Sequence, residues 1–260
     1  ELGRVVTLHE AGEFHCCTSP SAYTYCEGAG EDYSCALHDS DYNPTDWLIS
    51  QSELLRLVQF HNSDGYSACA GSEDGFCPGQ DGTLQGDGDA RIAMAREVKG
   101  LDANGGVGDA TELEVVVTLN KNGASDVTAL GILEDLPTGW RFDRMGDAAR
   151  PDVMPVTGAT KEITFTWLDV PVFPVEMSYF VNVSSDPGTD SQVVGYAEHR
   201  ATGRALFSNT AVSYIGEDLE VMLAHDISGL TEGGYLAPET ESLDILVTLD
   251  TTRPDAVDNV

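Results

Sequence analysis

The chain has 260 residues, of which 41% are hydrophobic, enough for one large domain or for a smaller unit joined to a domain of roughly 150 residues. Its 44 acidic residues outnumber its 13 lysines and arginines, and the formal net charge is -31. A surface this negative repels nucleic acid and anionic membranes, which excludes both as partners, and it serves either as a solubilising surface or for binding cations.

No run of about 18 apolar residues is present, so the sequence predicts no insertion into a membrane. The N-terminus also lacks a basic region followed by an apolar core. We therefore expect any export signal to be missing already from this chain.

All six cysteines lie in the first third of the chain. They are Cys16, Cys17, Cys26, Cys35, Cys69 and Cys77. An even number of clustered cysteines in a glycine-rich segment predicts disulfides formed outside the cytosol. Cys69 and Cys77 stand apart from the others and are expected to pair, which leaves the pairing of the other four open. The alternative is a zinc site of His15, Cys16 and Cys17, although paired C-x-x-C spacings are absent.

Residues 1–89 contain an internal repeat. The segment 1–9 matches 53–61 at an offset of 52 residues, and each copy runs on into a segment of cysteine, glycine and acidic residues. Such repeats predict stacked units that are each too small to bury their own apolar face. Because residue 1 falls inside a unit, we expect the chain to be cut from a longer precursor. The acid pairs 31–32 and 73–74 either add carboxylates to a cation site or solvate a loop.

The loop before the second copy predicts a calcium site. It offers oxygen ligands at alternating positions, then a main-chain carbonyl and an acid at the start of a helix over 54–62. The predicted ligands are Asp39, Asp41, Asn43, Asp46, the carbonyl of Leu48, and Glu53. Calcium takes six to eight oxygens of these kinds. The alternative is an Asx-turn that leads into a helix capped by Ser50 or Ser52, with Glu53 in the first turn.

The helix over 54–62 has an apolar face that must be covered. Its apolar residues are Leu54, Leu55, Leu57, Val58 and Phe60. We expect this face to pack against a helix over residues 2–8, as a pseudo-symmetric pair. Docking on another subunit is the alternative.

Residues 90–216 read as an antiparallel two-sheet sandwich, so the fold class is mainly β. Apolar and polar residues alternate along short segments that are separated by turn residues such as Asn122-Gly123. The predicted strands cover 91–98, 112–120, 126–134, 161–168, 175–183, 192–200 and 205–215. Seven or more short strands with little helix are typical of a sandwich.

Residues 217–260 form a predicted C-terminal extension with strands near 219–223 and 243–249. The second of these contains Leu243, Ile245, Val247 and Leu249. A strand beyond a glycine-rich stretch either completes its own sheet or adds to the edge of a neighbouring subunit, which would build a fibre.

The loop 39–53 resembles the EF-hand loop, and more closely the dockerin half-site, in which one helix follows the loop. Between Asn43 and Ile49 lie five residues where that family has two. Together with Trp47 and the segment 73–76, it is similar to a tandem calcium-loop repeat of large secreted proteins in environmental bacteria. Residues 127–132 and 136–140 resemble Ig-like or cohesin-like repeats of bacterial surface proteins. These resemblances imply an extracellular, non-catalytic protein with bound Ca²⁺.

Catalytic motifs are absent from the sequence. His9 and His15 are six residues apart, whereas the zinc-protease helix needs four, and no Gly-x-Ser-x-Gly elbow occurs. We therefore expect no enzyme. Two functions remain: a calcium-stabilised surface or filament protein that assembles with itself or with other surface proteins, or an adhesion module that binds glycans through Tyr42, Trp47 and Tyr66. Packing of Trp47 in the core is the alternative for that residue.

Overall fold

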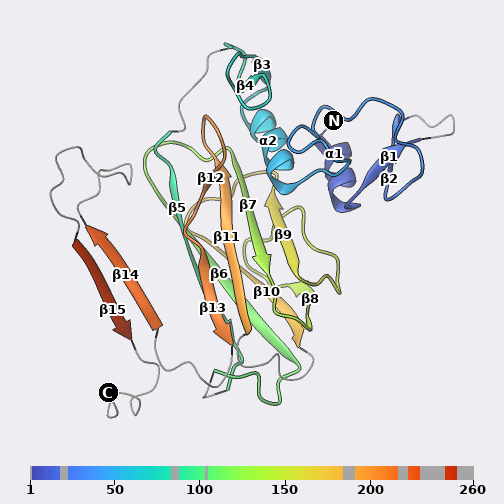
Figure 1. Cartoon of the computed structure of the whole chain (residues 1–260). Coiled ribbons are helices and arrows are strands. Elements are labelled where there is room, and N and C mark those ends of the chain that lie inside the picture. The colour runs from blue at the N-terminus through green and yellow to red at the C-terminus, as the bar shows by residue number, and fades with distance from the viewer. Residues whose placement is uncertain are drawn as a thin grey trace.

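The computed structural model describes residues 2–17, 23–82, 88–102, 105–183, 191–215, 222–228 and 244–250. Two helices with short hairpins come first, a sandwich of two antiparallel sheets follows, and a further hairpin ends the described chain (Figure 1). This is the mainly β fold that the sequence predicts. No helix in these ranges is long and apolar enough to cross a membrane.

One sheet of the sandwich has four strands and the other has five. The four-stranded sheet runs in the order β5 (Arg91–Lys99), β6 (Glu112–Asn122), β10 (Val175–Val183), β8 (Trp140–Met145). The five-stranded sheet runs in the order β12 (Leu206–Phe207), β11 (Ser191–Arg200), β7 (Ala129–Asp135), β9 (Glu162–Trp167), and β13 (Ala211–Ile215) also pairs with β11. Every pairing between these strands is antiparallel.

The seven predicted strands are all present, with two differences. The predicted strand 205–215 is divided into β12 and β13, and β8 was not predicted. The core between the sheets is built by alternation: Leu113, Val115 and Val117 of β6 are buried and lie in one cluster with Phe165. Burying each such side chain stabilises the fold by about 1.5–3 kcal/mol.

A buried ion pair crosses this core. Arg96 Nη2 of β5 lies 2.6 Å from Glu134 Oε2 of β7, and both side chains are fully buried. Arg96 Nη1 also donates to the carbonyls of Val193 (2.7 Å) and Ala211 (3.0 Å). Burial raises the pKa of Glu134 to about 7, and the charge of Arg96 opposes that rise. One arginine therefore connects four strands from the two sheets.

The two sequence copies have the same order of elements. In the first copy, α1 (Leu2–Glu10) precedes the hairpin β1 (Phe14–Cys16) and β2 (Tyr25–Glu27). In the second copy, α2 (Gln51–Asn62) precedes β3 (Tyr66–Ala68) and β4 (Phe76–Pro78). The offset of 52 residues carries β1 onto β3. Each unit is thus a helix followed by a hairpin.

Helix α2 lies between α1 and the five-stranded sheet (Figure 1). Leu54, Leu55 and Val58 are buried in one cluster with Val5 of α1 and Ala129 of β7. A Cβ on Gly131 would lie 2.1 Å from Gln51 Nε2, so glycine at this point of β7 permits the close approach of the helix. The apolar face of α2 is therefore covered by α1, as expected, and by the sandwich as well.

The C-terminal strand pairs within a separate hairpin. β14 (Met222–Ser228) and β15 (Asp244–Asp250) form an antiparallel two-stranded sheet, and its backbone register pairs Ile227 with Ile245 and Leu223 with Leu249. Leu243 lies outside the described residues, and the strand expected at 219–223 begins at Met222. Addition of this strand to a neighbouring subunit remains a prediction.

Candidate functional site: the loop and groove between the two repeats

All six cysteines form disulfides, as predicted. The pairs are Cys16–Cys35, Cys17–Cys26 and Cys69–Cys77. Cys17 and Cys69 are equivalent under the 52-residue offset, so the Cys17–Cys26 and Cys69–Cys77 disulfides close matching hairpins. The zinc alternative is wrong, because Cys16 and Cys17 are both bonded to other cysteines.

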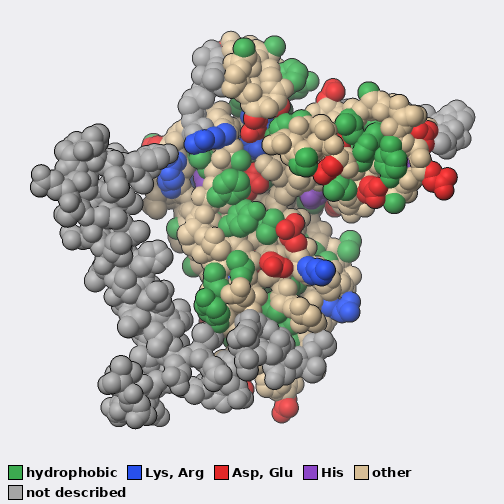
Figure 2. Space-filling view, in the orientation of Figure 1, with side chains coloured by type: hydrophobic (Ala, Val, Ile, Leu, Met, Phe, Trp, Pro, Cys, Tyr) green, Lys and Arg blue, Asp and Glu red, His purple; other side chains and the backbone are tan. Residues whose placement is uncertain are grey.

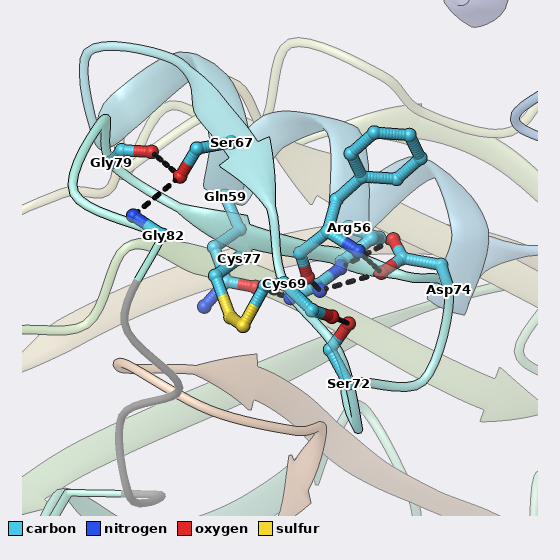
Figure 3. Close-up of a disulfide and its surroundings, with 10 residues drawn as sticks. Arg56, Gln59, Ser67, Cys69, Ser72, Asp74, Cys77, Gly79 and Gly82 are labelled. Atoms are coloured by element: carbon cyan, nitrogen blue, oxygen red, sulfur yellow. Dashed lines mark hydrogen bonds and ion pairs between the residues drawn. A yellow bond between two sulfur atoms is a disulfide. The ribbon is translucent and has the colours of Figure 1, made fainter.

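The second hairpin is held closely to α2, as Figure 3 shows. Ser67 donates to the carbonyl of Gly79 (2.9 Å) and accepts from the amide of Gly82 (2.8 Å). Arg56 of α2 binds both carboxylate oxygens of Asp74, each at 2.9 Å. The Cys69–Cys77 disulfide therefore closes a loop that contains Asp74. The bidentate ion pair between Asp74 and Arg56, a strong and directional contact, fixes this loop to the helix.

The acid pair 73–74 binds arginines. Burial acts to raise the pKa of Asp74, but hydrogen bonds from Arg56 and from the amide of Phe76 hold it below its usual range. Glu73 accepts from Arg200 of β11 and from the hydroxyl of Tyr42, the latter at 3.2 Å. The pair thus joins the hairpin to α2 and to the sandwich, and so does more than solvate the loop.

Two buried carboxylates organise the predicted calcium loop. Asp41 accepts the amides of Asp46 (3.0 Å) and Trp47 (2.8 Å). Glu53 Oε1 accepts the amides of Tyr42 (2.7 Å) and Asn43 (2.8 Å). Both side chains therefore bind backbone donors of the loop itself.

Glu53 also forms a capping box with Ser50. Glu53 Oε2 accepts the amide and the hydroxyl of Ser50, each at 2.9 Å, while the Glu53 amide donates to Ser50 Oγ. Ser50 is thus the N-cap that the alternative interpretation of this loop proposed.

The predicted calcium ligands do not form a ready metal site. Asp46 accepts the amide of Leu48 (3.1 Å), and Asp39 is exposed. Within the described part of the chain, no three His, Cys, Asp or Glu side chains are grouped to hold a metal ion. This geometry does not fit a preformed calcium site, and calcium binding stays a prediction from the sequence.

A groove of about 540 Å³ lies beside this loop, between the two repeats. Tyr42 and Tyr66 line it, whereas Trp47 packs against Phe14 (ring centroids 5.3 Å apart) and Tyr33 (5.0 Å). The structure therefore brings together two of the three aromatic residues expected to bind a ligand and places the third in the packing beneath the loop.

The groove has further lining residues that sequence analysis did not assign to a site. Phe60 and Arg56 come from α2, and Phe76 comes from β4. The helical pattern predicts that Phe60 is a core residue, and Phe60 is buried, with 8% of its surface exposed. Only the packing of the hairpin against the helix shows that Phe60 and Phe76 lie beside Tyr66.

Comparison with solved structures shows distant likenesses. No family model matches the sequence, and no curated protein matches it. The major pilin SpaD of Corynebacterium diphtheriae is 12% identical, with a TM-score of 0.34. The match covers 52% of this chain but only 36% of the length of the pilin.

Two collagen-binding domains give similar values. That of the Enterococcus faecalis surface protein ACE is 8% identical, with a TM-score of 0.30 over 47% of this chain and 95% of the domain. The collagen-binding domain of a Staphylococcus aureus adhesin is 11% identical, with a TM-score of 0.27. The match covers 50% of this chain and 100% of that domain. Likenesses with TM-scores this low establish neither a family nor a function for the chain.

Proposed function

We propose that this chain is a non-catalytic, extracellular protein with a structural or adhesive role at a bacterial surface. The observation that carries the proposal is the covalent closure of the repeat region by three disulfides. Disulfides persist in oxidising compartments outside the cytosol. The sequence resemblance to repeats of bacterial surface proteins supports the same location.

The junction between the repeat region and the sandwich supports a structural role. Helix α2 buries its apolar face against β7, Arg200 of β11 binds Glu73, and Ser52 donates to Glu198 of β11 at 2.7 Å. The side chain of Arg200 is 1% exposed. Because apolar packing and buried ion pairs join the two parts, we expect them to unfold as one stiff unit.

Assembly into a filament through β15, with the chain itself or another surface protein as partner, belongs to the same proposal. Its support is that β15 pairs with no other described strand than β14, because an isolated two-stranded hairpin is at best marginally stable in water. The alternative function is an adhesion module that binds glycans or another ligand, and the groove favours it because a concave, aromatic-lined site of this size is typical of ligand binding.

Surface labelling of intact cells tests the location. A membrane-impermeant biotin reagent is applied to cells that make the protein naturally, and the cysteines are then mapped by mass spectrometry without reduction. We expect labelling without lysis and all three disulfides intact. A cytosolic protein labelled in parallel controls for leakage. Labelling only after lysis, with free thiols, would contradict the proposal.

A further inference from the structure

The groove between the repeats has walls from both hairpins, from the predicted calcium loop and from α2. Tyr25 of β2, Tyr42 of the loop, Tyr66 of β3 and Phe76 of β4 all line it. Its volume of about 540 Å³ lies within the range of pockets that bind whole ligands. The groove therefore has room for several residues of an extended peptide.

The rings of Tyr66, Phe76 and Phe60 stand at angles to one another in this groove. Tyr66 and Phe76 have centroids 5.3 Å apart and ring planes at 86°, and Phe60 lies 5.1 Å from Tyr66 at 39°. Tyr66 is 57% exposed and Phe76 is 40% exposed. Rings arranged in this way make a corner instead of the flat platform on which a neutral sugar ring stacks. A corner of aromatic faces suits a cation, which is attracted to each ring face.

The charges around the groove favour a cation as well. Among the described residues that line it, Asp39, Glu53 and Asp74 carry carboxylates, and Arg56 has the one guanidinium. That guanidinium is already bound by Asp74 and stacks on Phe60, with Cζ 4.4 Å from the ring centroid. Asp39 is exposed and accepts no hydrogen bond from any residue that the structure describes. The net charge of -31 adds a long-range attraction for cations.

We propose that this groove binds a basic peptide segment of a partner protein, with a lysine or arginine side chain seated against Tyr66 and Phe76 and paired with Asp39. The aromatic corner supplies the contact area, and the Asp39 carboxylate, which has no partner among the described residues, supplies the charge. This binding activity goes beyond the structural role proposed above, and either one can fail without the other.

The test must separate this groove from the general attraction of an acidic protein for basic peptides. Isothermal titration of the full chain with hexalysine is compared with titration of the double variant Tyr66→Ala, Phe76→Ala, which has the same charge. We expect the double variant to bind about tenfold more weakly and Asp39→Asn to bind more weakly too. Tyr214→Ala, which removes an exposed tyrosine of β13, should leave the affinity unchanged.

Further titrations identify the ligand class. Fully acetylated hexalysine should not bind, and a panel of neutral oligosaccharides and the polyamine spermine should bind more weakly than hexalysine. Circular dichroism confirms that each variant is folded. Equal affinity of the wild type and the folded double variant, binding of acetylated peptide or of oligosaccharide in preference to hexalysine, or no binding of hexalysine would each overturn the proposal.

Discussion

At the scale of single residues, one glycine of the sandwich leaves no room for a side chain. Gly195 of β11 faces the Arg96–Glu134 ion pair. A Cβ at this position would lie 2.5 Å from the carbonyl oxygen of Leu133, 2.8 Å from Arg96 Nη2 and 2.8 Å from Glu134 Cδ. The neighbouring atoms are a backbone oxygen and a fully buried charged pair, so none of them can move away cheaply.

We therefore expect Gly195→Ala to lower the free energy of unfolding by about 2–4 kcal/mol, through overpacking and disturbance of a buried ion pair. Urea unfolding followed by circular dichroism measures the change. The matched control is Gly3→Ala in α1, where nothing lies within 4 Å of the added methyl group and where alanine favours the helix by about 1 kcal/mol. An unchanged midpoint for Gly195→Ala would show that the strands shift to admit the methyl group.

At the scale of elements, the loop before α2 depends on one carboxylate. Glu53 is 2% exposed and accepts hydrogen bonds from the amides of Tyr42, Asn43 and Ser50 and from the Ser50 hydroxyl. Glu53→Gln puts an amide group against these donors. We expect the free energy of unfolding to fall by about 1–3 kcal/mol, even in excess EDTA, because the bonds involve no metal ion.

Chemical unfolding in EDTA checks this expectation, with Glu97→Gln on the exposed side of β5 as the control that removes the same charge. If Glu53→Gln destabilised the protein only when calcium was present, the carboxylate would act through a metal ion and not through the loop amides.

The strands and hairpins also show how much of the fold the sequence predicts. Period-2 burial predicted the strands of both sheets, but β8 was missed although Trp140 and Phe142 alternate with charged residues and are both buried. The pairing of Cys17 with Cys26 was readable as well, because the 52-residue offset relates Cys17 to Cys69. Both patterns can be read from the sequence without knowing which residues meet in the fold.

The groove is different, because its rings meet only through tertiary packing. Phe60 belongs to a helix, while Tyr66 and Phe76 belong to two strands of a hairpin that folds back along it. Periodicity places Phe60 in the core and says nothing about which hairpin residues lie next to it. The same holds for Arg200 and Glu73, which are 127 residues apart in the sequence and bind each other at the junction.

At the scale of the whole molecule, the charge acts on every part of the fold. The 44 acidic residues are opposed by 13 lysines and arginines, and Figure 2 shows acidic side chains at many separate places on one face. Repulsion among them destabilises the compact state. Salt screens such interactions, with a Debye length of about 8 Å at physiological ionic strength.

We therefore expect the midpoint of thermal unfolding to rise as sodium chloride is increased from low to physiological concentration. Calcium chloride at matched ionic strength then separates screening from a specific site. A further rise in the midpoint with calcium, abolished by Asp39→Asn, would confirm the calcium site predicted from the sequence. Equal midpoints in the two salts would mean that the loop is only the hydrogen-bonded turn that Asp41 and Glu53 already form. A midpoint that does not rise with sodium chloride would contradict the repulsion itself, and would mean that local ion pairs such as Arg200–Glu73 outweigh the net charge.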